Sequence, residues 1–249
     1  MAEQIIKSNV DISKILLELS DFQKKLIPAV AMDTVNHIAN IAAKKVRTAM
    51  SQVFDRPTPY TLNSIFVKPA KVASLEAFAY VGIKDWPDKG IAANKFLSPE
   101  IYGGQRNLKR SEEALLRKGL LPVGSLAIAP GKGMKLNQYG NIPGSAMVSI
   151  LSGLKAFSEV GYIANRAAKT KTKKPRQFIV FDPPGKGTLG VYERYGTGMR
   201  KVKPLLAFIK QPHYKPRLRF HDIILDEYHA KFAKLFLEKI QYNKSLIGG

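Results

Sequence analysis

The segment from residue 176 to 221 limits most strongly what this chain can fold into. It contains three short runs that are rich in β-branched and aromatic residues, and such runs suit a half-buried pleated strand. The three runs are residues 177–181, 189–192 and 205–209. Glycine- and proline-rich stretches at 183–187 and 196–198 separate them, and these residue types favour tight turns. The segment therefore predicts antiparallel strands that lead into one last helix.

Positive charge is concentrated in the same part of the chain. The protein has 249 residues and a formal net charge of +21. Residues 160–221 hold 15 Lys or Arg against two acids, Asp182 and Glu193. One interpretation is a solvated face that serves solubility. The favoured interpretation is an acidic partner, either nucleic acid, an anionic membrane surface or an acidic protein face.

Composition sets the class of protein. A chain of 249 residues with 45% hydrophobic and 24% charged residues is globular, with one large domain or two small ones. The absence of cysteine excludes disulfides, thiolate catalysis and cysteine-based metal sites. The N-terminal residues lack the pattern of a secretory signal, and no apolar run approaches a membrane span. We therefore expect a protein made in a cytoplasm, with no membrane span, and we do not count a membrane among its partners.

Two helices are expected in the first 53 residues. Residues 11–26 form an amphipathic pattern, and Pro28 then fits near the start of a second helix that runs to residue 53. The apolar stripe of this second helix is Val35, Ile38, Ala39, Ala42, Val46, Ala49 and Val53. Its alanines permit close approach of another element. We favour packing across a sheet, and the alternative is a subunit interface.

The fold class predicted from these patterns is α+β. A strand pair is expected at 64–67 and 77–83, with the second strand buried on both faces because apolar residues fill both sides of its alternation. A closing amphipathic helix is expected at 222–243. The prediction is a small, mostly antiparallel sheet flanked by the helices at 28–53 and 222–243.

Residues 86–160 differ in character from the rest of the chain. They are rich in glycine and lack a long apolar period, although helices are expected at 109–118 and 146–157. We interpret this stretch as an irregular subdomain inserted into a composite domain. The predicted division is 1–85 for the N-terminal helices and strand pair, 86–160 for the insert, and 161–249 for the rest of the sheet, the basic loops and the last helix.

No motif in the sequence specifies catalysis. The glycine–lysine stretches at 130–133 and 184–188 lack the full spacing of a phosphate-binding loop and are interpreted as plain turns. The acidic pairs Glu112-Glu113 and Asp226-Glu227 lie near helix starts, where the helix dipole explains them. The four histidines, interpreted as structural or surface residues, are His37, His213, His221 and His229. We predict no catalytic residue, no cofactor, no metal and no enzyme activity.

The basic loops are the candidate functional site. The residues expected to touch DNA or an acidic partner are Lys169, Lys171, Lys173, Lys174, Arg200, Lys201 and Lys203. No ribonucleoprotein motif accompanies them, so the expected contact is with a nucleic-acid backbone and is independent of base sequence.

Several segments carry a resemblance to a known family. They are the helix at 39–53, the pair 190–194 and 204–208, the proline-containing lead 214–220 into the last helix, and residues 96–104 and 109–112. In this order they resemble the minor tail protein Z, or tail completion, group of tailed bacteriophages, which is related to neck and head–tail connector folds.

This resemblance implies a non-enzymatic structural protein of the virion tail or neck, assembled in the host cytoplasm. Such proteins complete the top of the tail and help join it to the head, typically in six-fold rings through which the genome passes. The implied partners are further copies of the chain, other tail and neck proteins, and genomic DNA in the lumen. The alternative function is a free, sequence-nonspecific nucleic-acid-binding protein, such as an RNA chaperone or a ribosome-associated factor. An enzyme would require a site in the 86–160 insert.

Overall fold

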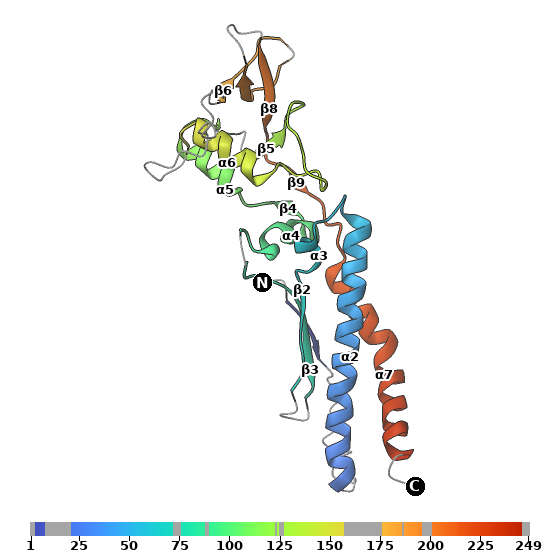
Figure 1. The fold of residues 1–249 in the computed structure, drawn as a ribbon. Coiled ribbons are helices and arrows are strands. Elements are labelled where there is room, and N and C mark those ends of the chain that lie inside the picture. The colour runs from blue at the N-terminus through green and yellow to red at the C-terminus, as the bar shows by residue number, and fades with distance from the viewer. Residues whose placement is uncertain are drawn as a thin grey trace. The chain divides into compact units, whose positions relative to one another are not determined.

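The chain forms two compact units. In the computed structural model, the described residues are 3–7, 21–71, 76–87, 90–122, 124, 127–156, 176–185, 187–195 and 201–245. The helical unit comprises residues 1–103 and 215–249, and the inserted unit comprises residues 104–214. Both combine helices with small antiparallel sheets, so the predicted α+β class is confirmed (Figure 1).

The helical unit consists of a three-stranded sheet and two long helices. Its elements are β1 (Glu3–Lys7), α2 (Asp21–Val53), α3 (Pro59–Leu62), β2 (Ile65–Lys68), β3 (Phe78–Ile83), α4 (Ala93–Tyr102) and α7 (Phe220–Ser245). The strand order is β1-β3-β2, and both pairings are antiparallel. The predicted strand pair and the predicted last helix are thus confirmed.

α2 packs across the sheet, as the favoured interpretation of its alanine-rich stripe predicted. Its fully buried positions include Val35, Ile38, Ala39, Ala42 and Val46. They share one core with Ala79, Val81 and Ile83 of β3, because small side chains let the helix approach the strands closely. α2 begins at Asp21, so Pro28 lies inside the helix and the predicted break near residue 26 is wrong. The first ten residues of the helix predicted at 11–26 lie outside the described residues.

α7 packs along α2 (Figure 1). Two ion pairs join the helices, Lys45 with Glu227 and Lys239 with Asp33. The segment before α7 is hydrogen-bonded to α4, because the Glu100 carbonyl oxygen accepts hydrogen bonds from the amides of Arg217 and Leu218 at 2.7 and 2.9 Å. These contacts fix the direction in which α7 leaves the sheet.

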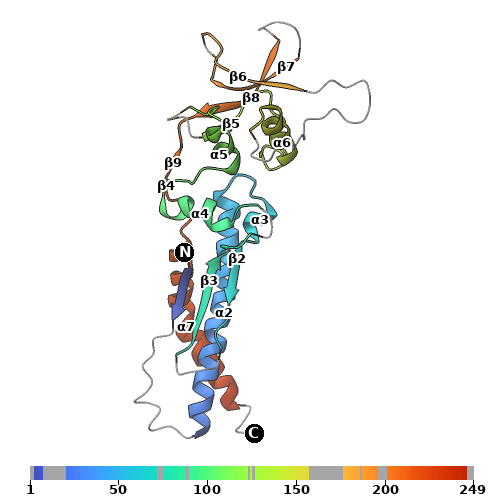
Figure 2. The same cartoon turned by 90° about the vertical axis from the view of Figure 1, so that its left-hand side faces the viewer.

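The inner face of β3 is buried, whereas its outer face is only partly covered. Ala79 and Val81 are inaccessible, whereas Phe78 is 39% exposed and Tyr80 is half-buried. The prediction of a strand buried on both faces is therefore wrong at Phe78 and Tyr80, although Gly82 on the same face is buried. Among the described residues the helices cover the inner face of the sheet alone, and Figure 2 shows the sheet in front of α2 and α7.

The inserted unit has a regular sheet of its own. Its elements are β4 (Gly104–Gln105), α5 (Arg110–Arg117), β5 (Ala127–Pro130), α6 (Gly144–Gly153), β6 (Gln177–Phe181), β7 (Gly190–Arg194), β8 (Val202–Ile209) and β9 (His213–Tyr214). β4 pairs with β9, and a four-stranded antiparallel sheet has the order β5-β8-β7-β6. Leu115, Ile150 and Leu206 lie in its core.

This arrangement corrects the predicted division of the chain. The strands at 177–209 do not join β2 and β3, because β8 pairs with β5, a strand that lies within the predicted 86–160 insert. The insertion accordingly runs from residue 104 to 214 and is built around a sheet. The helices predicted at 109–118 and 146–157 are present as α5 and α6, the second two to four residues earlier.

A β-bulge between β7 and β8 shapes this sheet. The register shifts between Val191 and Tyr192, and Tyr192 lies opposite Pro204. Proline lacks an amide donor, so a central strand tolerates it where the ladder is already interrupted. On β7, just before the bulge, Gly190 is buried against the backbone of β8 at Leu206.

Candidate functional site

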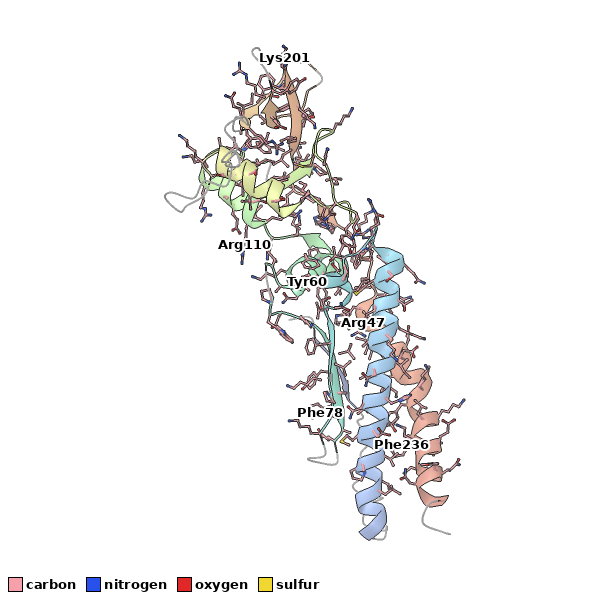
Figure 3. The ribbon with its side chains drawn as sticks, viewed as in Figure 1. Arg47, Tyr60, Phe78, Arg110, Lys201 and Phe236 are labelled. Atoms are coloured by element: carbon pink, nitrogen blue, oxygen red, sulfur yellow. The ribbon has the colours of Figure 1, made fainter. Side chains whose placement is uncertain are left out.

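Six basic side chains gather around one end of the four-stranded sheet. This cluster, the basic end, consists of Lys132, Lys135, Arg176, Arg194, Lys201 and Lys203, and all six are exposed. Figure 3 shows Lys201 at the tip of the sheet. The cluster is drawn from four separate segments of the chain.

Antiparallel pairing brings three of these segments together. β6 begins at Gln177, which lies opposite Arg194 at the end of β7. Arg194 in turn lies opposite Val202 at the start of β8. The residues just before β6, at the end of β7 and at the start of β8 therefore share one edge of the sheet. Four of them are basic, namely Arg176, Arg194, Lys201 and Lys203.

The turn after β5 carries Lys132, and Lys135 follows two residues after Gly133, the last residue of this turn that hydrogen-bonds to β8. The amides of Gly131 and Gly133 donate to the carbonyl oxygens of Leu205 and Pro204, each at 2.8 Å. Both positions require glycine, because a β-carbon would collide with the β8 backbone at Pro204. These amides hold the turn against β8 and are not directed at a ligand. The stretch at 130–133 is thus a plain turn, as predicted.

Glu193 is the one acidic side chain of the basic end among the described residues. It accepts two hydrogen bonds from the Arg176 guanidinium, the second at 2.7 Å from Nη2, and it lies opposite Lys203 in the β-ladder. The Arg176 hydrogen bond lowers the pKa of Glu193, burial opposes this, and the charges of Arg176 and Lys203 lower it further. Glu193 is therefore ionised at neutral pH, and it offsets one of the six positive charges.

The Arg176 side chain is held in place on both sides. Its guanidinium lies 5.1 Å from the centre of the Phe178 ring, in a cation–π contact, while its edge binds Glu193. Lys201 and Lys203, by contrast, are exposed ammonium groups on flexible stems. Such a mixture supplies positive charge and does not form a rigid pattern of donors of the kind that reads bases.

The structure describes two of the seven residues predicted for the site. Lys201 and Lys203 lie at the basic end, at the start of β8. Lys169, Lys171, Lys173, Lys174 and Arg200 lie outside the described residues. Sequence reasoning missed Lys132, Lys135, Arg176 and Arg194 as site residues. The strand register that brings the last two beside β8 could have indicated them, whereas the pairing of β5 with β8 has no local sequence signal.

The histidines are structural or exposed where the structure describes them. His221 at the start of α7 lies 2.9 Å from the Tyr102 hydroxyl through Nε2. Burial lowers the pKa of His221, and the nearby charge of Asp222 opposes this shift. His37, His213 and His229 are exposed. Within the described ranges, no group of three or more His, Asp or Glu could hold a metal ion.

Two acids that the helix dipole was expected to explain have other partners. Glu112 is fully buried and binds Arg106, and Glu227 is buried beside Lys45 and Lys231. The dipole interpretation is thus incomplete for both residues. Each carboxylate ties its helix to a neighbouring segment or helix, and neither lies at the basic end.

Comparison with known proteins identifies no relative of this chain. No family model, no curated protein and no solved structure matches the chain. None of the helices in the described part of the chain is long and apolar enough to cross a membrane. The basic end is therefore the feature of the molecule from which a function is inferred.

Proposed function

We propose that this chain is a structural protein of a tailed-bacteriophage virion, which completes the top of the tail and joins it to the head or neck. It acts by assembly and by charge contact, not by catalysis. The observation that carries the proposal is the basic end, where the described residues include six exposed Lys or Arg side chains and the one carboxylate of Glu193. In a homo-oligomeric ring, six-fold by resemblance, this charge is repeated around a lumen through which DNA passes.

The segments that carry the family resemblance supply further support. α2 is the long alanine-rich helix, β7 and β8 are the strand pair, and α7 is the closing helix. The proline-containing lead into α7 is held by Glu100. The Arg217 and Leu218 amides donate hydrogen bonds to the Glu100 carbonyl oxygen, and the Arg217 guanidinium binds the Glu100 carboxylate at 2.7 Å. The lead therefore orients α7 against the rest of the helical unit.

The inserted unit supplies the charge. Residues 104–214 hold 20 Lys or Arg against five Asp or Glu. Two of those five acids, Glu112 and Glu193, are already bound to Arg106 and Arg176. A polyanion near the basic end thus meets a field with little local compensation, and contact releases its counterions whatever the base sequence.

The location of the protein tests this function directly. Particles are purified from the source, and mass spectrometry and gold labelling establish whether the chain is present and where. A few copies at the head–tail junction are expected. Absence from particles, together with recovery of the protein on cellular nucleic acid, would overturn the proposal.

Charge neutralisation tests the part played by the basic loops. Alanine replaces Lys201, Lys203 and the five predicted basic residues at 169–174 and 200, and the matched control replaces exposed Lys118 and Lys155 of the same unit. The seven-residue variant should lose salt-sensitive binding to DNA or an acidic virion protein, together with particle assembly. Binding and assembly that both match the control would contradict a role for these residues.

A free nucleic-acid-binding protein is the second candidate function. The observation in its favour is Tyr195, which is 66% exposed directly after Arg194 at the basic end, where a single-stranded base could stack on it. This alternative predicts that the isolated chain binds DNA or RNA tightly without assembly partners, with affinity that falls steeply as salt is added. Tyr195→Ala should then weaken binding to single strands more than binding to duplex.

A further inference from the structure

The sheet of the helical unit presents an aromatic surface on its outer side. This aromatic face consists of Phe66, Lys68, Phe78, Tyr80 and Trp86, in which Phe78 is 39% and Trp86 is 50% exposed. The Phe66 and Trp86 rings lie 5.0 Å apart between centres, and Phe78 meets Tyr80 edge to face at 5.5 Å. Exposed apolar patches of roughly 300–600 Å² frequently mark interaction sites.

A glycine in β3 allows the Phe66 ring to pack on the outer side of the sheet. Gly82 lies opposite Phe66 in the ladder, and a β-carbon at Gly82 would lie 2.7 Å from the Phe66 ring. The missing side chain therefore lets the ring lie flat over the strand. Lys68 lies 5.5 Å from the centre of the Tyr80 ring. Among the described residues Lys68 forms no ion pair, so its charge is available to a partner.

α7 carries a second partly exposed apolar surface. This α7 flank consists of Leu225, His229, Phe232, Ala233, Phe236 and Leu237, whose spacing of three and four residues puts them on one side of the helix. Leu225 is 38% and Leu237 is 58% exposed, while Phe232 and Phe236 stack on each other at 5.6 Å. Exposed Asp226 lies within the flank, and the described residues contain no ion pair to it.

The two surfaces lie on different sides of one unit. The inner face of the sheet packs on α2, and in Figure 1 the strands lie on one side of α2 and α7 on the other. A surface on one side that binds a different surface on the other side of a second copy makes a head-to-tail contact. Such contacts close into rings or continue into filaments.

We propose that the aromatic face of one copy binds the α7 flank of the next copy, with Lys68 facing Asp226 across the contact. This inference rests on the proposed function, which requires assembly, and it names the surfaces that assemble. Aromatic rings, leucines and a pair of opposite charges match the composition of buried interface cores and their polar rims. The occupant of the aromatic face is therefore a second copy of this chain.

Engineered cysteines test the contact without disturbing a core. The chain has no cysteine, so each new thiol is unique. Trp86→Cys and Leu237→Cys variants of the full chain are purified, mixed in equal amounts and oxidised. A disulfide-linked dimer should form in the mixture and not in either variant alone. Dimers from Trp86→Cys alone to the same extent, or no dimer in the mixture, would overturn the proposal.

Solution association supplies a second test. The wild-type chain should form oligomers in sedimentation, whereas Trp86→Glu and Leu237→Glu should each be monomeric when alone and form discrete dimers when mixed. Leu136→Glu, at a 43% exposed position of the inserted unit, is the matched control and should associate like wild type. A wild-type chain that stays monomeric at all concentrations would also overturn the contact. Gold labelling of particles reads out the proposed function separately, so the two failures are distinguishable.

Discussion

Arg106 and Glu112 form a two-point ion pair inside the inserted unit, with nitrogen–oxygen distances of 2.6 and 2.7 Å. The Glu112 side chain is 0% exposed and that of Arg106 is 11% exposed. The same carboxylate accepts from the amides of Lys109 and Ile128, at 2.7 and 3.0 Å. One side chain thus joins the segment before α5, the first turn of α5 and the strand β5.

We predict that Glu112→Gln destabilises the chain strongly. The amide replaces one acceptor oxygen with a donor that faces other donors, and it leaves the Arg106 charge buried without its counter-ion. Breaking a buried pair in this way costs about 3–5 kcal/mol. Urea unfolding measures the loss, and Glu113→Gln, at the exposed neighbouring position, is the control. Equal unfolding midpoints for the two variants would contradict the role assigned to Glu112.

Glu112 should also make the stability of the folded chain depend on pH in the acid range. Burial alone would raise the pKa of Glu112, but hydrogen bonds from Arg106, Lys109 and Ile128 outweigh burial and hold it below the ordinary value of 4.5. As pH falls below 4.5, Glu112 is protonated in the unfolded chain before it is protonated in the folded chain. The stabilisation that ionised Glu112 gives is therefore lost as pH falls from 4.5 to the folded-state pKa. Wild type should therefore lose more stability than Glu112→Gln between pH 5 and pH 3. Parallel pH profiles for the two proteins would rule this out.

Gly190→Ala should also destabilise the inserted unit. A β-carbon at residue 190 would overlap the carbonyl oxygen of Leu206 on β8, and both strands are central in their sheet. The strands would have to separate, at a cost of about 1–3 kcal/mol or more. Gly144→Ala is the matched control, because nothing lies within 4 Å of its added carbon. Thermal unfolding of both variants gives the comparison, and a Gly190→Ala midpoint equal to that of the control would argue against the clash.

Long periodic segments of the fold could be predicted from the sequence. The stripe from Val35 to Val46 indicated α2, and the run of β-branched and aromatic residues at 177–181 indicated β6, because each pattern extends over several turns or a whole strand. β5 was missed because Ala127–Pro130 is short and its apolar residues are mostly alanine. Without it, the four-stranded sheet and the boundaries at 104 and 214 could not be inferred.

The basic end was only partly predictable for the same reason. Charge density indicated Lys201 and Lys203, since both lie in the most basic stretch of the chain. Lys132 lies some 70 residues before them and reaches the site only because the 130–135 turn hydrogen-bonds to β8. Long-range pairing of this kind has no signature in local composition. The buried role of Glu112 was missed likewise, because its partner amide at Ile128 lies 16 residues away.

His221 predicts a separate effect near neutral pH. Burial lowers the pKa of His221 from 6.5, and the charge of Asp222 offsets this only in part. In the unfolded chain the His221 side chain is protonated near pH 6.5, whereas in the folded chain it is protonated only at lower pH. The helical unit should therefore lose stability as pH falls from 6.5 to the folded-state pKa of His221. His221→Gln should flatten this dependence between pH 7.5 and pH 5.5. His213→Gln, at an exposed position, should not, and equal slopes for all three proteins would exclude the effect.

Glu193→Gln should strengthen binding of the basic end to a polyanion. The substitution removes the carboxylate that binds Arg176, so the basic end loses one negative charge. If Arg176 then contacts one more phosphate, the salt dependence of duplex DNA binding steepens by about 0.9 in the log–log slope. Asp182→Asn is the matched control, because Asp182 follows β6 at the opposite end of the sheet. At about 3.3 Å per residue it lies roughly 20 Å from Arg176, well beyond the screening length of about 8 Å at physiological salt. Fluorescence anisotropy with a duplex at several salt concentrations measures both variants, and equal affinities for the two would show that Glu193 does not limit the field of the basic end.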